Sequence, residues 1–379
     1  MRKVYEDFIY LMRCTLNGES AKDFSGGDFG ELFRIAQDHN MTNMLYYALQ
    51  DNCSVPDEIS QELQKYHDLM VYKCAYQKAA EQEMERLFNE NEIRYMLLKG
   101  CTVRDLYPSE DMREMADIDI LVSKQDLEKI RKFMIASGYE FKGDRDHHDV
   151  YIKNAFVSVE VHYTVPGCLN EYFDSLSWSG AIRHGFKYSL DVSENYIYLI
   201  NHLHGHFIFG GIGVRSLLDI FLYEKEYVTD INWEYINLIF EEYGILDFVK
   251  NLRALNDAWF GQGRSDEMLD EMGEYVFKSG SYGRVTHAIM SSADGTESDV
   301  GVTLKALKKA IFLPVREMHN RMRILDKFPF LLPFGYLARL VSILFKQFRR
   351  LSGWTKSLRA VNAESVKKHK EMLERFGIH

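Results

Sequence analysis

The sequence is poor in two residue types that would constrain its fold. Its 379 residues include only six prolines, which favours long helices and argues against Pro-rich linkers. The five cysteines are scattered, and no two have the spacing of a metal-binding pair, so we expect reduced thiols. A chain of this length suits two or three domains and can bury a sizeable core.

The sequence also lacks the apolar runs of secreted and membrane proteins. Its N-terminus, Met-Arg-Lys-Val-Tyr-Glu-Asp, turns acidic at once and contains no apolar signal-peptide region. No uncharged segment is long enough for a membrane span, so we expect a cytoplasmic protein. Segment 328–350 is apolar with a basic end. We favour a helix packed on the core over contact with an anionic membrane surface.

Charge is unevenly distributed along the chain. The net charge is −10, but residues 301–379 contain 17 Lys and Arg against five Asp and Glu, so they carry +12 and the rest carries −22. This basic tail suggests an anionic partner, such as RNA or a lipid headgroup, or contact with the acidic body of the protein itself. A charged helical surface is the alternative, and nucleic-acid binding is not favoured.

Hydrophobic periodicity divides the chain into three regions. Residues 1–90 have helical spacing, residues 91–190 form an α/β core, and residues 191–379 return to helical spacing and end in the basic tail. We therefore predict an α+β protein in which a small mixed sheet with helices is embedded between helical N- and C-terminal regions.

The middle region contains five segments that predict strands, namely 93–98, 115–122, 139–141, 149–153 and 156–163. The last two flank Asn154-Ala155 and predict a hairpin. Ser123 is a good N-cap for a helix over residues 124–137.

Two aspartates interrupt the second of these strands. Side chains two residues apart share a face of a strand, so Ile118 and Ile120 would face a core while Asp117 and Asp119 project together from the other face. Neighbouring carboxylates repel each other unless a cation or a proton lies between them. The pair therefore indicates a metal site, and a solvated strand edge is the alternative.

The last predicted strand adds a third carboxylate. Alternation places Glu160 and His162 on its polar face, and Val159 and Val161 on its core face. If this strand lies beside residues 115–122, Glu160 joins Asp117 and Asp119. Mg²⁺ prefers oxygen ligands, and two such ions about 3.5–4 Å apart can clamp a phosphoryl or nucleotidyl displacement.

These motifs occur in an order that resembles the uncharacterised nucleotidyltransferase family of bacteria, within the polymerase-β-like superfamily. The segments that carry the similarity are Leu98-Lys99-Gly100, Arg113, Asp117-Ile118-Asp119 and Glu160-Val161-His162. Residues 202–206 and 215–220 resemble the helical part that follows the core of that family. The resemblance covers most of the chain from about residue 25 onward, and it implies a nucleotidyltransferase-like sheet.

The resemblance implies roles for the carboxylates and the turn. Asp117 and Asp119 would bind two Mg²⁺ ions, with Mn²⁺ as the alternative. Glu160 would ligate one metal and deprotonate the attacking hydroxyl. Gly100 would close a turn that lets a triphosphate approach the backbone. Cys101 stands where many superfamily members have serine.

The cationic and histidine residues of the motif would bind substrate. Lys99 and Arg113 would neutralise phosphate charge. The others that we assign to the substrate cleft are His162, His202, His206 and Arg215. Each has a structural alternative: a solvated strand end for Lys99, an ion pair with Asp111 or Glu114 for Arg113, a packed strand position for His162, and a helix ion pair with Asp219 for Arg215.

Two further groups have open interpretations. His202 and His206 share a helix face and, with His204 or Asp219, could ligate zinc, although we favour structural or substrate-facing histidines. His147 and His148 could face the site, but a loop position is favoured. The insert between Gly100 and Asp117 carries Glu110, Asp111 and Glu114, which would oppose a triphosphate unless they turn away.

The sequence therefore predicts Mg²⁺-dependent transfer of a nucleoside monophosphate from an NTP to a hydroxyl or phosphate of an unknown small-molecule or macromolecular acceptor. One alternative is a catalytically degenerate fold of this type that binds a ligand or partner. Another is a phosphohydrolase that uses a transition metal bound through His202 and His206.

Overall fold

The computed structural model describes residues 1–145, 148–175, 178, 181–281, 283, 287, 290–291, 318, 329–336 and 363–378. Most of the basic tail and most of segment 328–350 lie outside the described residues, as does His147. Among the residues described, no helix is both long and apolar enough to cross a membrane.

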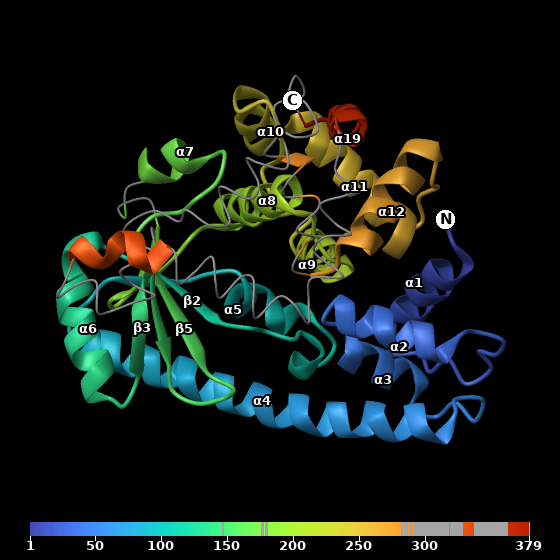
Figure 1. Cartoon of the computed structure of the whole chain (residues 1–379), viewed down its shortest axis with the longest axis horizontal. Coiled ribbons are helices and arrows are strands. Elements are labelled where there is room, and N and C mark those ends of the chain that lie inside the picture. The colour runs from blue at the N-terminus through green and yellow to red at the C-terminus, as the bar shows by residue number, and fades with distance from the viewer. Residues whose placement is uncertain are drawn as a thin grey trace.

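A mixed sheet of seven strands lies at one end of the described structure (Figure 1), in the order β3-β4-β5-β2-β1-β7-β6. The strands are β1 Tyr95–Leu97, β2 Ile118–Val122, β3 Glu140–Arg145, β4 His148–Ile152, β5 Ser158–His162, β6 Ile182–His184 and β7 Lys187–Ser189. Strand β2 is central, and it pairs in parallel with β5 and antiparallel with β1. This sheet, flanked by helices, confirms the predicted α+β class.

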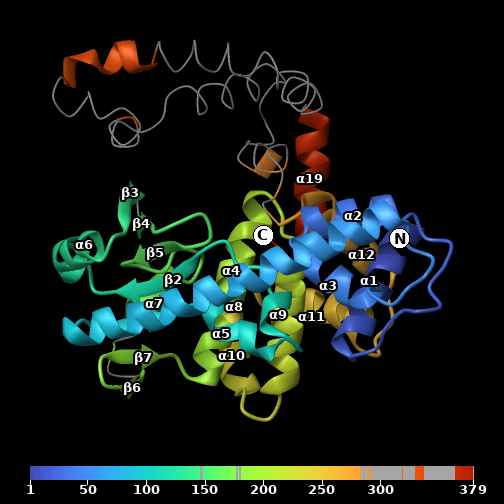
Figure 2. The same ribbon diagram turned by 90° about the horizontal axis from the view of Figure 1, so that it is seen from below.

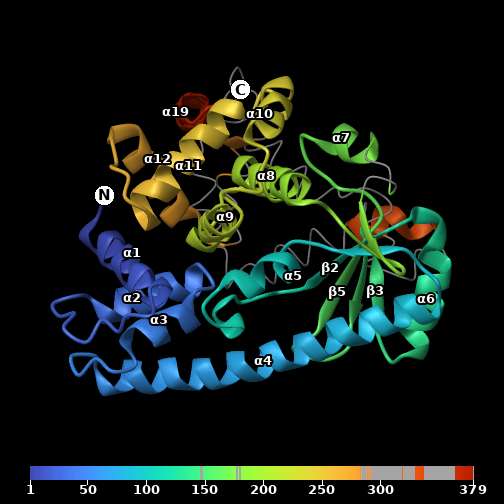
Figure 3. The ribbon, with the colours of Figure 1, turned by 180° about the vertical axis from the view of Figure 1, so that it is seen from behind.

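Helices surround the sheet on both sides. Their bounds are α1 Lys3–Leu16, α2 Phe29–Asp38, α3 Thr42–Leu49, α4 Asp57–Glu90, α5 Gly100–Val103, α6 Leu127–Ala136, α7 Asn170–Ser175, α8 Val192–Phe209, α9 Val214–Glu226, α10 Trp233–Glu242, α11 Leu246–Phe260, α12 Glu267–Ser279 and α19 Ala363–Arg375. The 34-residue α4 runs beneath both the sheet and the N-terminal helices, and α8 and α9 lie on the opposite side (Figures 1 and 3).

Two hydrophobic clusters organise the packing. One joins the C-terminal half of α4, including Met84 and Phe88, to α6 and one face of the sheet. The other joins α1–α3 directly to the helices that follow the sheet (Figure 2). Within it the Tyr5 and Phe277 rings stack 4.0 Å apart. The N- and C-terminal helices thus share a core, and the division into three domains stays a prediction.

The predicted strand faces are confirmed. Ile118, Ile120, Val159 and Val161 all lie in the sheet cluster. The hairpin of β4 and β5 also forms as predicted. Because β5 lies beside β2, Asp119 is directly paired with Glu160.

Residues 124–136 are helical and Ser123 stands at the N-cap position, as predicted, but the first turn, Lys124–Asp126, is a 3-10 helix and the Ser123 side chain makes no cap hydrogen bond. The short strands β6 and β7 were not predicted, although β7 extends the sheet by pairing in parallel with β1.

The acidic insert before β2 holds the N-terminal helices in place. The Glu114 carboxylate accepts hydrogen bonds from the backbone N–H groups of Thr42 (3.0 Å) and Asn43 (3.4 Å) and from the Tyr66 hydroxyl (2.6 Å). It therefore caps α3, whose own N-cap residue makes no side-chain cap bond. Glu110 pairs with Lys78. All these contacts lie on the helical side of the insert.

Asp111 shows the same orientation. Its carboxylate accepts hydrogen bonds from the Asn43 amide (2.6 Å) and the Tyr47 hydroxyl (3.0 Å), and it also bonds Ser109. Glu110, Asp111 and Glu114 therefore turn towards α3 and α4.

We predict that Glu114→Ala lowers the free energy of unfolding by about 1–3 kcal/mol, because it leaves buried N–H groups of α3 unsatisfied. Glu110→Ala is the matched control: it removes a partly exposed ion pair and should cost only about 0–1 kcal/mol. Urea unfolding measures both. Equal losses in the two variants would contradict the capping role.

Candidate active site

A cavity of about 490 Å³ lies between the ends of β1, β2 and β5 and the helices α8 and α9. Nine of the ten residues that the sequence assigned to the site line it, namely Lys99, Gly100, Arg113, Asp117, Asp119, Glu160, His202, His206 and Arg215. The tenth, His162, lines a neighbouring cavity of about 480 Å³ together with four of these residues. The structure thus brings the whole set together, and the roles of its members stay predictions.

Asp119 is the most buried carboxylate of the cavity, with 3% of its surface exposed. Its Oδ1 accepts hydrogen bonds from Lys99 Nζ at 2.8 Å and from His162 Nε2 at 2.7 Å. Burial opposes ionisation, but the Lys99 ammonium and His162 outweigh it and hold the pKa of Asp119 well below its usual range. Asp119 is therefore a permanent negative charge.

The pKa of Asp117 is shifted in the opposite direction from that of Asp119. Burial, and then the charges of Asp119 and Glu160, raise its pKa to about 6. Lys99 and Arg215 only partly offset this rise. The three carboxylates therefore interact electrostatically, and the cavity carries more negative charge than its cations balance.

The turn between β1 and α5 is strained at Lys99. Lys99 has φ +47° and ψ −114°, and the Cys101 N–H closes the turn on the Leu98 carbonyl at 3.3 Å. A non-glycine residue in such a region costs about 1–3 kcal/mol, which the surrounding contacts must supply. The ion pair of Lys99 with Asp119 is one such contact.

Gly100 directly follows this turn, and its part in phosphate binding stays a prediction. It is the first residue of α5, and its φ is not positive. A Cβ atom there would lie 2.6 Å from Arg113 Nη1 and 2.9 Å from Met115 Cε. Gly100 is therefore needed because a guanidinium and a methionine pack against its backbone.

Arg113 pairs with neither Asp111 nor Glu114. Its Nε and Nη2 donate to the two carboxylate oxygens of Asp219 on α9, at 2.9 and 2.8 Å. The Tyr107 hydroxyl also donates to Asp219, at 2.7 Å. This buried pair connects the insert to the helical part across 106 residues of sequence.

The alternative that the sequence left open for Arg215, a helix ion pair with Asp219, does not form. Arg215 donates a hydrogen bond to the backbone carbonyl of Glu114, while Asp219 is held by Arg113. Arg215 lines the cavity and is close enough to lower the pKa of Asp117. It is a cation of the cavity wall.

His202 and His206 face each other on α8, with ring centroids 4.5 Å apart. Burial, and then the Lys99 charge, lower the pKa of both. The ligands that would complete a zinc site with them are engaged elsewhere: His204 Nδ1 lies 3.2 Å from Cys168 Sγ, and Asp219 binds Arg113. Neutral histidines that line the cavity fit this arrangement better.

His148 is the site residue that the sequence reasoning placed wrongly. It is the first residue of β4, not part of a loop, and it lies opposite His162 in the sheet. The predicted hairpin contained the signal, because extending its register by one residue would have paired His148 with His162. In the part of the chain that the structure describes, His148, Glu160 and His162 form a group of three potential metal ligands.

Comparisons with known proteins identify the family. No match was found among curated proteins or among solved structures. The model of a family described as uncharacterised nucleotidyltransferase matches residues 25–261, which is more than half of the chain and contains every lining residue of both cavities except Ser281. The chain therefore belongs to the uncharacterised nucleotidyltransferase family, and we identify it as a transferase enzyme.

Proposed function

We propose that the protein transfers a nucleoside monophosphate from an NTP to a hydroxyl or phosphate of a small acceptor molecule, with release of pyrophosphate and with Mg²⁺ as the cofactor. The observation that carries this proposal is that Asp117, Asp119 and Glu160 line one cavity together with Lys99 and Arg215.

The donor set suits Mg²⁺ at the aspartates. Carboxylate oxygens are the ligands that this ion prefers, and Mg²⁺ would also neutralise phosphate charge. Asp117 and Asp119 would hold it, and Mn²⁺ is the alternative ion. Burial and the charges of Asp119 and Glu160 raise the pKa of Asp117, and a bound cation would favour its ionised form.

The cationic residues would hold the triphosphate. Lys99 Nζ lies beside Asp119, and Arg215 lies on the facing wall, so phosphates between them would meet positive charge from two sides. Arg113 Nη1 lies against the Gly100 turn, which leaves Arg113 next to the same phosphates while its other nitrogens hold Asp219. Glu160 would accept the proton of the attacking hydroxyl.

The second cavity is where we place the acceptor. Its volume of about 480 Å³ lies within the range of about 300–1,000 Å³ that small-molecule sites occupy. It shares Lys99, Glu160, His202 and His206 with the first cavity, so an acceptor hydroxyl there would lie next to the proposed base. A site of this size favours a small molecule over a long nucleic acid.

Aspartate substitutions test the reaction. With Mg²⁺, each of the four NTPs and an acceptor library, the wild-type protein should produce pyrophosphate and an acceptor with the added mass of a nucleoside monophosphate. We expect Asp117→Asn and Asp119→Asn each to reduce this product at least about 100-fold, because even the outer partners of metal ligands contribute about 10–100-fold. Mass spectrometry measures the adduct.

Asp105→Asn is the matched control, since Asp105 is exposed and lies outside the lining of both cavities. It should retain full activity. If calorimetry detects binding of neither NTP nor Mg²⁺ to the wild-type protein, the proposed reaction is wrong.

Substitutions of Gly205 test whether the acceptor binds in the second cavity. Gly205 lies within α8 and lines the second cavity, and a Cβ there would meet no atom within 4 Å. Gly205→Ala should raise the free energy of unfolding by about 0.5–1 kcal/mol, because alanine favours the helix. Gly205→Leu should fill part of the cavity and raise the KM for the acceptor without raising that for NTP.

The control for Gly205 is Gly30→Ala in α2, where the nearest atom to a Cβ would be Asp28 Oδ1 at 3.5 Å. This change should leave both KM values unaltered. An unchanged acceptor KM in Gly205→Leu would place the acceptor elsewhere.

A further inference from the structure

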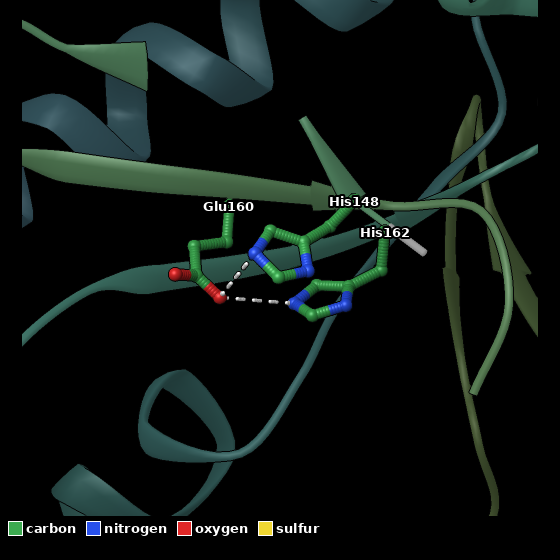
Figure 4. A group of neighbouring side chains, drawn as sticks. All are labelled: His148, Glu160 and His162. Carbon is green, nitrogen blue, oxygen red and sulfur yellow. Dashed lines mark ion pairs between the residues drawn. The ribbon is translucent and has the colours of Figure 1, made fainter. Parts of the chain in front are cut away.

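Two histidines and a glutamate converge on the polar face of the sheet (Figure 4), and His162 is hydrogen-bonded to Asp119. Glu160 Oε2 lies 3.4 Å from His148 Nε2 and 3.5 Å from His162 Nε2. One donor atom from each of the three residues lies within 4.8 Å of the other two. Both rings are directed at the same carboxylate oxygen.

Strand pairing fixes this convergence. His148 is paired with His162 across the β4–β5 hairpin, and Glu160 lies two residues before His162 on the same strand. Residues two apart share a face, and directly opposed residues share it too, so all three side chains must project together. Only 7% of His148 and 5% of His162 is exposed. The cluster is therefore rigid and built by backbone hydrogen bonds.

The distances from Glu160 Oε2 to the two ring nitrogens are compatible with metal ligands. An N–H···O hydrogen bond normally spans about 2.7–3.2 Å, so contacts of 3.4 and 3.5 Å are long for one. A tetrahedral Zn²⁺ site has bonds of about 2.0–2.2 Å, which places neighbouring ligand atoms roughly 3.3–3.6 Å apart. The two measured separations lie in that interval.

The chemistry of the donors selects a class of ion. Imidazole nitrogen suits Zn²⁺ and related transition metals, whereas Mg²⁺ is bound through oxygen. Two histidines and one glutamate are a ligand set of catalytic zinc sites, in which a fourth position stays open for water or substrate. In the structure His162 Nε2 is hydrogen-bonded to Asp119 Oδ1 at 2.7 Å, so a metal ion bound by this nitrogen would replace that hydrogen bond.

We propose that His148, Glu160 and His162 bind a transition-metal ion of the zinc class, at a site distinct from the Mg²⁺ site proposed at Asp117 and Asp119. Glu160 borders both sites, because it also lines the cavity of the aspartates. The site goes beyond the proposed function, since it requires neither NTP nor acceptor to form. It also differs from the histidine pair on α8.

Metal binding to the wild-type protein is the first test. The full-length protein is stripped with a chelator, dialysed and titrated with Zn²⁺ by calorimetry, and with Co²⁺ by visible absorption, in the absence of nucleotide. We expect one Zn²⁺ per chain to bind tightly even in excess Mg²⁺. X-ray absorption at the zinc edge should report two imidazole ligands, and this measurement does not depend on the folding of any variant.

Variants then locate the site. His148→Ala and His162→Ala should each weaken Zn²⁺ binding by at least about 10–100-fold, since the loss of a direct ligand should cost no less than the loss of an outer partner. Circular dichroism checks that each variant is folded. Two controls should bind Zn²⁺ like the wild type: His184→Ala, at an exposed position on β6, and His202→Asn, on α8.

Three results would overturn the proposal: no stoichiometric Zn²⁺ on the wild-type protein, zinc without imidazole ligands, or binding that survives in both His148→Ala and His162→Ala. Loss of binding in His202→Asn alone would assign the metal to α8 instead. Failure of the transferase assay would leave all of these outcomes unaffected, because no nucleotide is present.

Discussion

The ion pair between Lys99 and Asp119 is the interaction on which the site and much of its surroundings depend. A carboxylate buried as deeply as Asp119 needs a charged partner, because an unpaired buried charge would cost far more than the fold can supply. Lys99 provides it, and reaches it from a strained turn. That turn places Gly100 where the Arg113 guanidinium packs, and Arg113 in turn holds Asp219 on α9. One buried charge is thus connected through successive contacts to the helices that form the far wall of the cavity.

The sequence predicted those parts of the fold in which the pattern is local and periodic. Strands β2 and β5 alternate apolar and polar residues, and their core faces follow directly from that alternation. Strands β6 and β7 have three residues each, and β6 is exposed throughout, so neither carries such a pattern. They join the sheet because β7 pairs in parallel with β1, and this pairing is between segments that are far apart in the sequence. The side chain of Ser123 makes no cap hydrogen bond, and a 3-10 turn lies between this residue and α6.

For the site too, features that follow from a local sequence pattern could be predicted, and features that depend on tertiary packing could not. The grouping of Asp117, Asp119 and Glu160 follows from two strand patterns and one assumption of adjacency, which the β2–β5 pairing satisfies. The partners of the charged side chains do not follow from pattern. Arg113 bonds a residue 106 positions away, although two acids lie within two residues of it. Long side chains can reach many partners, and tertiary packing selects among them. Glu114 likewise caps a helix 71 residues earlier in the chain.

Glu160 lies between two groups of charged side chains. One group consists of Asp117 and Asp119, and the other consists of His148 and His162. On one side Glu160 adds to the negative potential that raises the pKa of Asp117. On the other it faces two imidazoles, and burial, which would raise its pKa, is outweighed by His162 and His148, so its pKa is lowered. A carboxylate that stays ionised between an oxygen-rich group and a nitrogen-rich group can balance a cation on either side. Hard and borderline metals prefer those two environments respectively. In the two sites that we propose, β5 contributes Glu160 to both, because it lies between β2, which carries Asp119, and β4, which carries His148.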